Sequence, residues 1–225
     1  MTASGMKARI FDDAQSVAQA TADLVAAALA GGVERLVLAG GTTPKLAYRL
    51  LSPGPVWGKV TIFFGDERCV PPDDPESNYA MAREELLSRV DPASVHRIPG
   101  ELGAEEAAAR YDAVLRGAGP LDLVLLGMGQ DGHTASLFPG APELGLTGAK
   151  AIAVHNAPKP PPDRISLSLE ALREARRVVF IVTGSDKADA VVKASRGEVP
   201  SGMVPGAEYL LDRAAAAALP EGATA

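Results

Sequence analysis

Short apolar runs alternate with segments of helical periodicity along most of this chain. The run 121–126 is almost uninterrupted, a pattern typical of a strand buried on both faces. Runs of similar length predict further strands between polar or glycine-containing segments. The predicted strands are 8–11, 36–39, 60–64, 121–126, 151–154, 164–167, 178–182 and 209–211.

Helical spacing is clearest between the first two predicted strands. Val17, Thr21, Leu24 and Ala28 fall on one helical face, Asp12 or Asp13 can cap its start, and two glycines follow residue 30. Pro44 suits the first position of the next helix, which we expect to reach residue 51. Further helices are predicted at about 77–89, 105–116, 169–175 and 186–195, with an alanine-rich helix after residue 211 and a frayed tail.

The repeated order of strand, turn and helix predicts an α/β fold with a mostly parallel sheet covered by helices on both faces. We find no internal repeat and no linker, so residues 1–225 are expected to form one domain with its core at about 8–212. Ligands in such folds bind at the carboxyl ends of the strands. Candidate site residues are therefore those that directly follow each predicted strand.

Composition limits the classes of partner. The chain has 22 basic and 28 acidic residues, a formal net charge of −6, which disfavours nucleic acid and requires a local group of donors for any anionic ligand. Cys69 is the single cysteine, which excludes an internal disulfide and favours the cytoplasm.

No apolar stretch approaches the length of a membrane span, and residues 1–9 lack the apolar core of a secretory signal. A monomer or weak dimer is expected.

The segment Gly40-Gly41-Thr42-Thr43-Pro44 follows the second predicted strand. Its glycines permit a tight turn and close approach of a ligand, its hydroxyls can donate hydrogen bonds, and the helix that follows attracts an anion. It lacks the Gly-Lys-Ser/Thr of a Walker loop. We interpret the segment as a phosphate cradle, with an ordinary capped helix start as the alternative.

Charged residues follow other predicted strands. Arg68 comes just after 60–64 and is a candidate guanidinium clamp for phosphate or a polarised carbonyl, whereas the adjacent Cys69 is interpreted as a small structural residue. Arg164 opens one later strand, and Lys187 follows another. Their alternative interpretation is that of solvated surface charges.

The segment 127–136 contains the spacing G-x-G-x-x-G, but two features disfavour a dinucleotide site. Pro139 ends any helix after about one turn, and no acidic residue closes the strand 151–154 to hold a ribose. We interpret the glycines as shaping a loop that presents Asp131 and His133. The carboxylate can orient the imidazole and stabilise its charged form, which suits a general base. His96 and His155 have no such neighbour in sequence and are expected to be structural.

Other catalytic chemistries have little support. The chain contains no G-x-S-x-G nucleophile elbow, and three scattered histidines do not predict a catalytic metal. What remains is water, a base and an anion cradle.

Five segments together resemble the 6-phosphogluconolactonase family, in that family's order and over residues 8–212. They are Leu38-Ala-Gly-Gly-Thr-Thr-Pro44, Phe64-Gly-Asp-Glu-Arg68, Ser77-Asn-Tyr79, Leu126-Gly-Met-Gly-Gln-Asp-Gly-His-Thr-Ala-Ser-Leu-Phe-Pro139 and Gly184-Ser-Asp-Lys187. The resemblance implies a three-layer, Rossmann-like fold shared with glucosamine-6-phosphate deaminase. It also implies hydrolysis of 6-phospho-D-glucono-1,5-lactone to 6-phospho-D-gluconate in the oxidative pentose phosphate pathway, with no cofactor or metal.

The resemblance also assigns roles residue by residue. His133 would be the general base and Asp131 its orienting partner. The substrate, chiefly its phosphate, would be bound by Gly41, Thr42, Thr43, Arg68, Arg164 and Lys187.

Two alternatives remain. The related amino-sugar-phosphate isomerases and deaminases share the Asp-Gly-His loop but carry Asn-Glu-Pro shortly afterwards, where this chain has Ser136-Leu-Phe-Pro139 without a carboxylate. A non-catalytic sugar-phosphate sensor would bind without turnover and normally carries a DNA-binding segment, which is not evident here.

Overall fold

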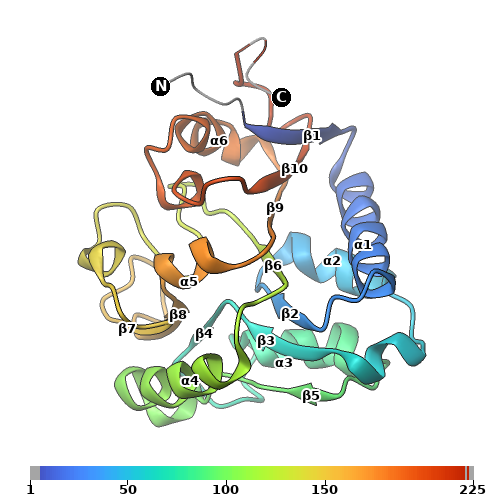
Figure 1. Ribbon diagram of the computed structural model, residues 1–225. Coiled ribbons are helices and arrows are strands. Elements are labelled where there is room, and N and C mark those ends of the chain that lie inside the picture. The colour runs from blue at the N-terminus through green and yellow to red at the C-terminus, as the bar shows by residue number, and fades with distance from the viewer. Residues whose placement is uncertain (1–5, 221, 223–225) are drawn as a thin grey trace.

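The computed structural model describes residues 6–220 and 222. Within these residues the main sheet has seven strands in the order β1-β10-β9-β6-β2-β3-β5, and each neighbouring pair is parallel (Figure 1). This confirms the predicted parallel α/β architecture. Its strands are β1 (Lys7–Phe11), β2 (Arg35–Leu38), β3 (Thr61–Phe64), β5 (Ser94–Val95), β6 (Leu123–Leu126), β9 (Val178–Val182) and β10 (Glu208–Asp212).

The helices follow the predicted order. The first begins where the side chain of Asp13 accepts a hydrogen bond from the Ser16 N–H at 2.8 Å, and it ends at Gly31, as its capping residues predict. The third is short and continues as a π-helical turn, η2 (Arg83–Leu87). The α-helices are α1 (Ala14–Ala30), α2 (Thr42–Leu50), α3 (Asn78–Ala82), α4 (Ala104–Ala118), α5 (Leu169–Glu174) and α6 (Ala188–Ser195).

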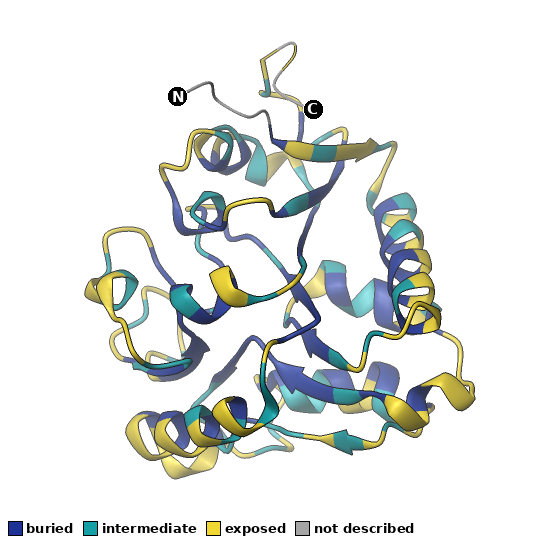
Figure 2. Ribbon diagram, in the orientation of Figure 1, coloured by how far each residue is buried: buried dark blue, intermediate teal, exposed yellow. Residues whose placement is uncertain are grey.

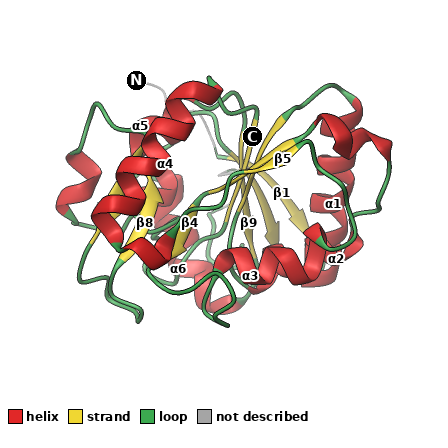
Figure 3. Cartoon of the chain, turned by 90° about the horizontal axis from the view of Figure 1, so that it is seen from below, coloured by secondary structure: helices red, strands yellow, loops and turns green. Residues whose placement is uncertain are grey.

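A second sheet lies beside the main one, and it corrects one expectation. The predicted strands 151–154 and 164–167 do not join the parallel sheet. They are β7 (Ala151–Val154) and β8 (Arg164–Leu167), which form an antiparallel sheet with β4 (Asp66–Arg68). Helices α1 and α2 lie on one side of the main sheet, and the second sheet with α4 and α5 lies on the other (Figure 3). Apolar runs predict strands but not their partners, because pairing is a tertiary choice.

The core is centred on the inner strands of the main sheet. All residues of β6 and β9 are buried, and Leu36, Val37 and Leu38 of β2 are at most 1% exposed (Figure 2). These are the segments whose apolar runs predicted strands covered on both faces. Because the inner strands are buried along their length, the polar residues that follow them become accessible together, at the carboxyl end of the sheet.

Two local expectations were wrong. Pro44 is the third residue of α2 and not its first. The alanine-rich segment 213–218 forms turns instead of a helix, since so few residues do not repay the cost of helix nucleation. The predicted frayed tail falls partly on residues 221 and 223–225, which lie outside the described residues. In the part of the chain that is described, no helix is long and apolar enough to cross a membrane.

Candidate active site

A cleft of about 390 Å³ opens at the carboxyl ends of the central strands. The connections from neighbouring strands β2 and β6 leave in opposite directions, toward β3 on one side and toward β9 on the other. Such a switch point leaves a crevice in a parallel sheet, and ligands bind there. The cleft is lined by segments that follow β2, β3, β6 and β9, together with the start of β8 and the loop before it.

The segment after β2 forms one wall, and its two glycines are needed for different reasons. Gly41 has a φ of 104°, which other residues rarely adopt. A side chain on Gly40 would meet the Asn78 amide oxygen at 2.0 Å. The Thr43 hydroxyl lies 2.7 Å from that of Thr183, which follows β9, so the start of α2 is tied to the neighbouring wall. The first residues of α2, Thr42 and Thr43, line the cleft, and a helix N-terminus in this position favours an anion.

The loop after β6 carries the predicted acid–base pair. His133 Nδ1 lies 2.5 Å from Asp131 Oδ1, and the ring packs against Phe138 with centroids 4.7 Å apart. Gly129 passes so close that a side chain there would overlap the imidazole ring at 2.1 Å. Gly132 has a φ of 83° and donates its N–H to the Gly129 carbonyl. The glycines therefore shape a loop around His133, which agrees with the interpretation that disfavoured a dinucleotide site.

The environment of His133 favours its neutral form. Its side chain is 16% exposed, and burial lowers the pKa of the imidazole below its usual 6.5, while the charge and hydrogen bond of Asp131 oppose this effect. Asp131 is 41% exposed and remains ionised, since its bonds to His133 hold its pKa below the ordinary range against the opposing effect of burial. Because Nδ1–H donates a hydrogen bond to the ionised Asp131 carboxylate, Nε2 carries no proton and can accept one.

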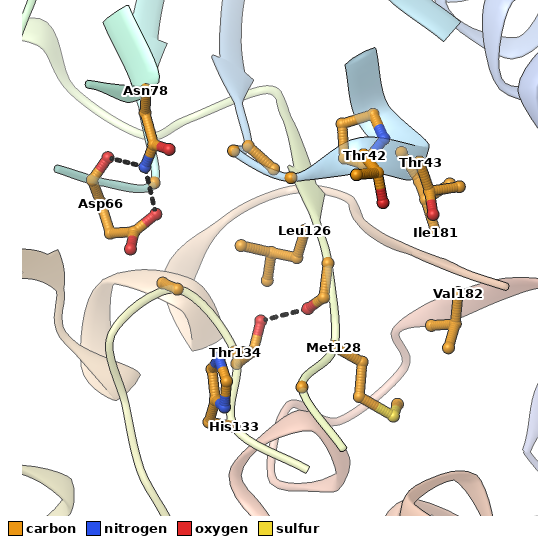
Figure 4. A pocket seen from close by; sticks show the side chains of 18 of the residues that line it. Thr42, Thr43, Asp66, Asn78, Leu126, Met128, His133, Thr134, Ile181 and Val182 are labelled. Carbon is orange, nitrogen blue, oxygen red and sulfur yellow. Dashed lines mark hydrogen bonds between the residues drawn. The ribbon is translucent and has the colours of Figure 1, made fainter. Parts of the chain in front are cut away.

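A buried carboxylate forms the wall opposite the cradle. Asp66 accepts hydrogen bonds from Ser136 Oγ at 2.7 Å and from the Asn78 amide at 3.0 Å. In Figure 4, Asp66 and Asn78 lie across the pocket from Thr42 and Thr43, with His133 at a third side. Asp66 therefore fixes the Asn78 amide, which lies against Gly40, and Ser136, which ends the segment that carries His133.

Cationic side chains outnumber carboxylates in the cleft. Arg68, Lys159, Arg164 and Lys187 line it together with only Asp66 and Asp186, which leaves two excess positive charges in a chain of net charge −6. This is the local group of donors that an anionic ligand requires.

Three of the four cations have polar partners in the structure. Lys187 pairs with Asp186 at 2.7 Å, and Arg68 lies 3.5 Å from the Glu76 carboxylate, with its Nε buried and unpaired within the described residues. Arg164 is only 4% exposed and donates Nε and Nη2 to backbone carbonyls of the preceding loop. One guanidinium nitrogen, Nη1, is therefore free of these bonds and available to a ligand.

The structure brings nearly all of the predicted site residues to one cleft. Those that line it are Gly41, Thr42, Thr43, Arg68, His133, Arg164 and Lys187. Asp131 lies behind His133 and orients it. The sequence analysis assigned no role to Asp66 or Asn78, although both lie in segments that carry the family resemblance. It did not predict Lys159 or Thr183 as site residues. Thr183 directly follows a predicted strand and was open to the same reasoning, whereas no local signal marks Lys159.

The other chemically notable residues lie elsewhere. His155 does have acidic neighbours, contrary to expectation: Asp163 at 2.9 Å, 8 positions away in sequence, and Glu105 at 3.0 Å, 50 positions away. It is 47% exposed and outside the cleft.

Burial raises the pKa of the Cys69 thiol to about 11, with Asp163 adding to the effect, so this cysteine is a poor nucleophile. Across the described residues, no cluster of histidine, cysteine and acidic side chains suits a metal ion.

Comparison with known proteins identifies the family. A family model described as "Glucosamine-6-phosphate isomerases/6-phosphogluconolactonase" matches residues 12–213, which is most of the chain. The chain belongs to this family. A 6-phosphogluconolactonase from Mycobacterium leprae is 39% identical over 241 aligned positions, covering 94% of this chain and 97% of the relative.

Solved structures agree with this placement. The 6-phosphogluconolactonase from Trypanosoma brucei superposes with a TM-score of 0.85 at 27% identity, covering 96% of this chain and 99% of that one. A monomeric glucosamine-6-phosphate deaminase has a TM-score of 0.80 at 22% identity and shares the fold, covering 95% of this chain and 100% of that one. The predicted fold class, shared between the two branches of the family, is thereby confirmed.

Proposed function

We propose that this family member hydrolyses 6-phospho-D-glucono-1,5-lactone to 6-phospho-D-gluconate, the second step of the oxidative pentose phosphate pathway. The decisive observation is that His133, with its Nδ1 2.5 Å from the Asp131 carboxylate, lies on the wall of a cleft that carries excess positive charge. A phosphorylated lactone needs both features: a base to activate water and cations for its phosphate. The lactonases among its relatives support the same reaction.

The chemistry requires few groups because a 1,5-lactone is an activated ester. His133 Nε2 accepts a proton from water as the water oxygen attacks the lactone carbonyl carbon, and the ring C–O bond then breaks as the same proton passes to the ring oxygen. Asp131 stabilises the intervening imidazolium. General-base catalysis of this kind contributes roughly 10²–10⁴-fold to the rate. No covalent intermediate and no cofactor are needed for this sequence of steps.

Substrate binding is assigned to the cradle and the cations. Gly41, Thr42 and Thr43 offer N–H groups and hydroxyls at the start of α2, and Lys187 lies at the neighbouring strand end. Lys45, by contrast, pairs with Glu85 at 2.9 Å and does not line the cleft. Arg68 offers a buried, unpaired Nε, and Arg164 its free Nη1. Binding energy from the phosphate serves to orient the distant lactone carbonyl against His133.

The deaminase alternative is disfavoured by the segment 136–139. In this chain Ser136 donates to Asp66, and Phe138 packs on the His133 ring. The positions that follow the Asp-Gly-His loop are therefore occupied by a hydroxyl and an aromatic ring, with no carboxylate to open an amino-sugar ring.

Three broader features of the protein are also proposals. The hydrophobic core is continuous from Met6 to Ala216, which supports one folding unit. The large apolar side chains that are exposed are scattered, which supports a monomer or weak dimer. A single cysteine, half-buried and with a raised pKa, fits the reducing cytoplasm.

A direct assay tests the function. Freshly generated 6-phosphogluconolactone should disappear faster than its spontaneous rate at catalytic enzyme concentration, with EDTA present. His133→Ala should lower kcat/KM at least about a hundredfold while binding of 6-phosphogluconate stays nearly intact. His96→Gln, which changes a histidine outside the cleft, serves as the matched control and should retain activity. Saturable binding of 6-phosphogluconate without turnover by the unmodified protein would instead support the sensor.

A further inference from the structure

The cleft has two chemically different ends. At one end Thr43 and Thr183 lie beside each other, and Lys187 ends η5 (Ser185–Lys187), the short helix that follows β9. At the other end the ring of Phe138 contacts both His133, with centroids 4.7 Å apart, and the Arg164 guanidinium, 5.8 Å from the ring centroid. In Figure 4, Thr42 and Thr43 lie on one side of the pocket, and His133 and Asp66 lie on its other sides.

A rigid loop lies at the His133 end. The segment 157–163, here called the proline-rich loop, contains four prolines and is closed by a hydrogen bond from the Ala157 N–H to the Pro162 carbonyl at 2.8 Å. The buried Arg164 donates to the carbonyls of Lys159 at 2.8 Å and Pro161 at 2.9 Å. The backbone at Lys159 is therefore held in place by one of the most buried charged groups in the cleft.

Lys159 extends from this loop as the freest cation of the cleft. Its side chain is exposed and lines the pocket, and within the described residues it lies in no ion pair. Lys187 differs, because its ammonium is already paired with Asp186 at 2.7 Å. The positive charge of Lys159 is close enough to lower the pKa of His133, an effect secondary to burial. Lys159 also lies on the His133 side by geometry, because Arg164, which donates to the Lys159 carbonyl, lies over the Phe138 ring that packs against His133.

The reaction creates negative charge on that side. The lactone carbonyl is neutral at the start, becomes an oxyanion when water attacks, and ends as a carboxylate. A cation at this position therefore contributes more to the transition state and product than to the bound substrate. The phosphate, whose charge does not change, needs a cation at the opposite end.

We propose that Lys159 recognises the C1 end of the ligand, stabilising the oxyanion during hydrolysis and binding the product carboxylate, while Lys187 serves the phosphate. This assignment rests on the proposed lactonase function and divides the cations of the cleft between two subsites. Arg164 acts on Lys159 as a positioning residue through the loop carbonyls.

Two ligands of matched length test the division. 6-Phosphogluconate and D-glucitol 6-phosphate have the same open chain and phosphate but differ at C1, where one has a carboxylate and the other an alcohol. The wild-type protein should bind 6-phosphogluconate about tenfold more tightly, as one charge-assisted hydrogen bond provides. Lys159→Met should abolish this preference, and Lys159→Arg should keep most of it. Lys187→Met should weaken both ligands equally.

Measurements of kcat, KM and the pH profile distinguish a catalytic role of Lys159 from a structural one. Lys159→Met should lower kcat about tenfold and change KM less than twofold, because its contact forms as charge develops. Loss of the nearby cation raises the pKa of His133, so the acid limb of the pH profile should move to higher pH. Lys193→Met, on the exposed surface of α6 and outside the cleft, is the matched control.

The outcomes separate this proposal from the function on which it rests. Equal wild-type affinity for the two ligands, or equal loss of both in Lys159→Met, would overturn the C1 assignment while lactone hydrolysis stands. Wild-type kcat and an unmoved pH profile in Lys159→Met would overturn it as well. Absence of lactone hydrolysis by the unmodified protein would instead refute the proposed function.

Discussion

At the scale of single residues, the proposed chemistry depends on two opposing effects on one imidazole, that of His133. Burial disfavours the charged form of His133, and the Asp131 carboxylate 2.5 Å away favours it. The net effect lowers the pKa, so the base is neutral and ready to accept a proton at neutral pH. Asp131 also selects the tautomer, because an acceptor beside Nδ1 keeps the proton there and leaves Nε2 free.

Replacing the carboxylate should therefore change both rate and pH dependence. In the wild-type enzyme the acid limb of kcat/KM should lie below the ordinary histidine pKa of 6.5. In Asp131→Asn the charge that raises the His133 pKa is lost, so the acid limb should move to still lower pH. The plateau rate should fall at least about tenfold, because the imidazolium and its tautomer lose their partner. A pH–rate profile from pH 4 to 9 measures both effects, and a limb that moved upward would contradict this account.

At the scale of secondary-structure elements, a buried carboxylate joins β4 to α3. Glu67 is 2% exposed and accepts hydrogen bonds from the N–H groups of Arg68, Asn78 and Tyr79 and from Ser77 Oγ, at 2.7–2.9 Å. It thereby satisfies the free N–H groups at the start of a helix of only five residues. This junction holds Arg68 and Asn78 at the cleft, so the active site depends on it.

Glu67→Gln should weaken that junction. The amide replaces one acceptor oxygen with an NH₂ group that faces backbone donors, which leaves buried N–H groups unsatisfied. We expect the free energy of unfolding to fall by about 2 kcal/mol, measured by urea denaturation. Glu84→Gln, an exposed change in the following turn, should stay within about 0.5 kcal/mol of wild type. Equal stability of the two variants would show that the Glu67 bonds contribute nothing.

At the scale of the whole molecule, charge and apolar surface are distributed unevenly. The chain is acidic overall, yet its cleft carries excess cations, so an anionic substrate is attracted to one location. The large hydrophobic side chains exposed on the described surface come from separate segments of the chain. They are Ile10, Val56, Val95, Leu102 and Leu146.

This distribution predicts a monomer. Sedimentation equilibrium at micromolar concentration should give a mass near the chain mass of 23.2 kDa, with at most weak association at higher concentration. Stable dimers usually bury about 800 Å² per subunit, which scattered apolar residues do not supply. A mass of twice the chain at the lowest measurable concentration would contradict the expectation and place an interface on a polar face.

Local sequence determined most strands and helices and much of the loop that carries His133, although it did not predict the short strands β4 and β5. The apolar runs of β6 and β9 predict buried strands because no other short structure hides so many consecutive apolar side chains. Asp13 and Gly31 predict the ends of α1 because the free backbone groups of a helix need partners nearby in sequence. Asp131 and His133 were predictable as a pair, because only Gly132 lies between them and their side chains can meet within one loop.

Tertiary structure decided which strands pair and which distant residues meet. The second sheet was not predictable, because an apolar run does not specify its neighbour. Asp66, Ser136 and Asn78 meet across 12 to 70 positions of chain. Lys159 lines the cleft from a loop whose backbone carbonyls accept hydrogen bonds from the buried Arg164, a contact that leaves no side-chain pattern in the sequence. Sequence patterns record interactions between near neighbours, whereas packing determines the contacts that complete this site.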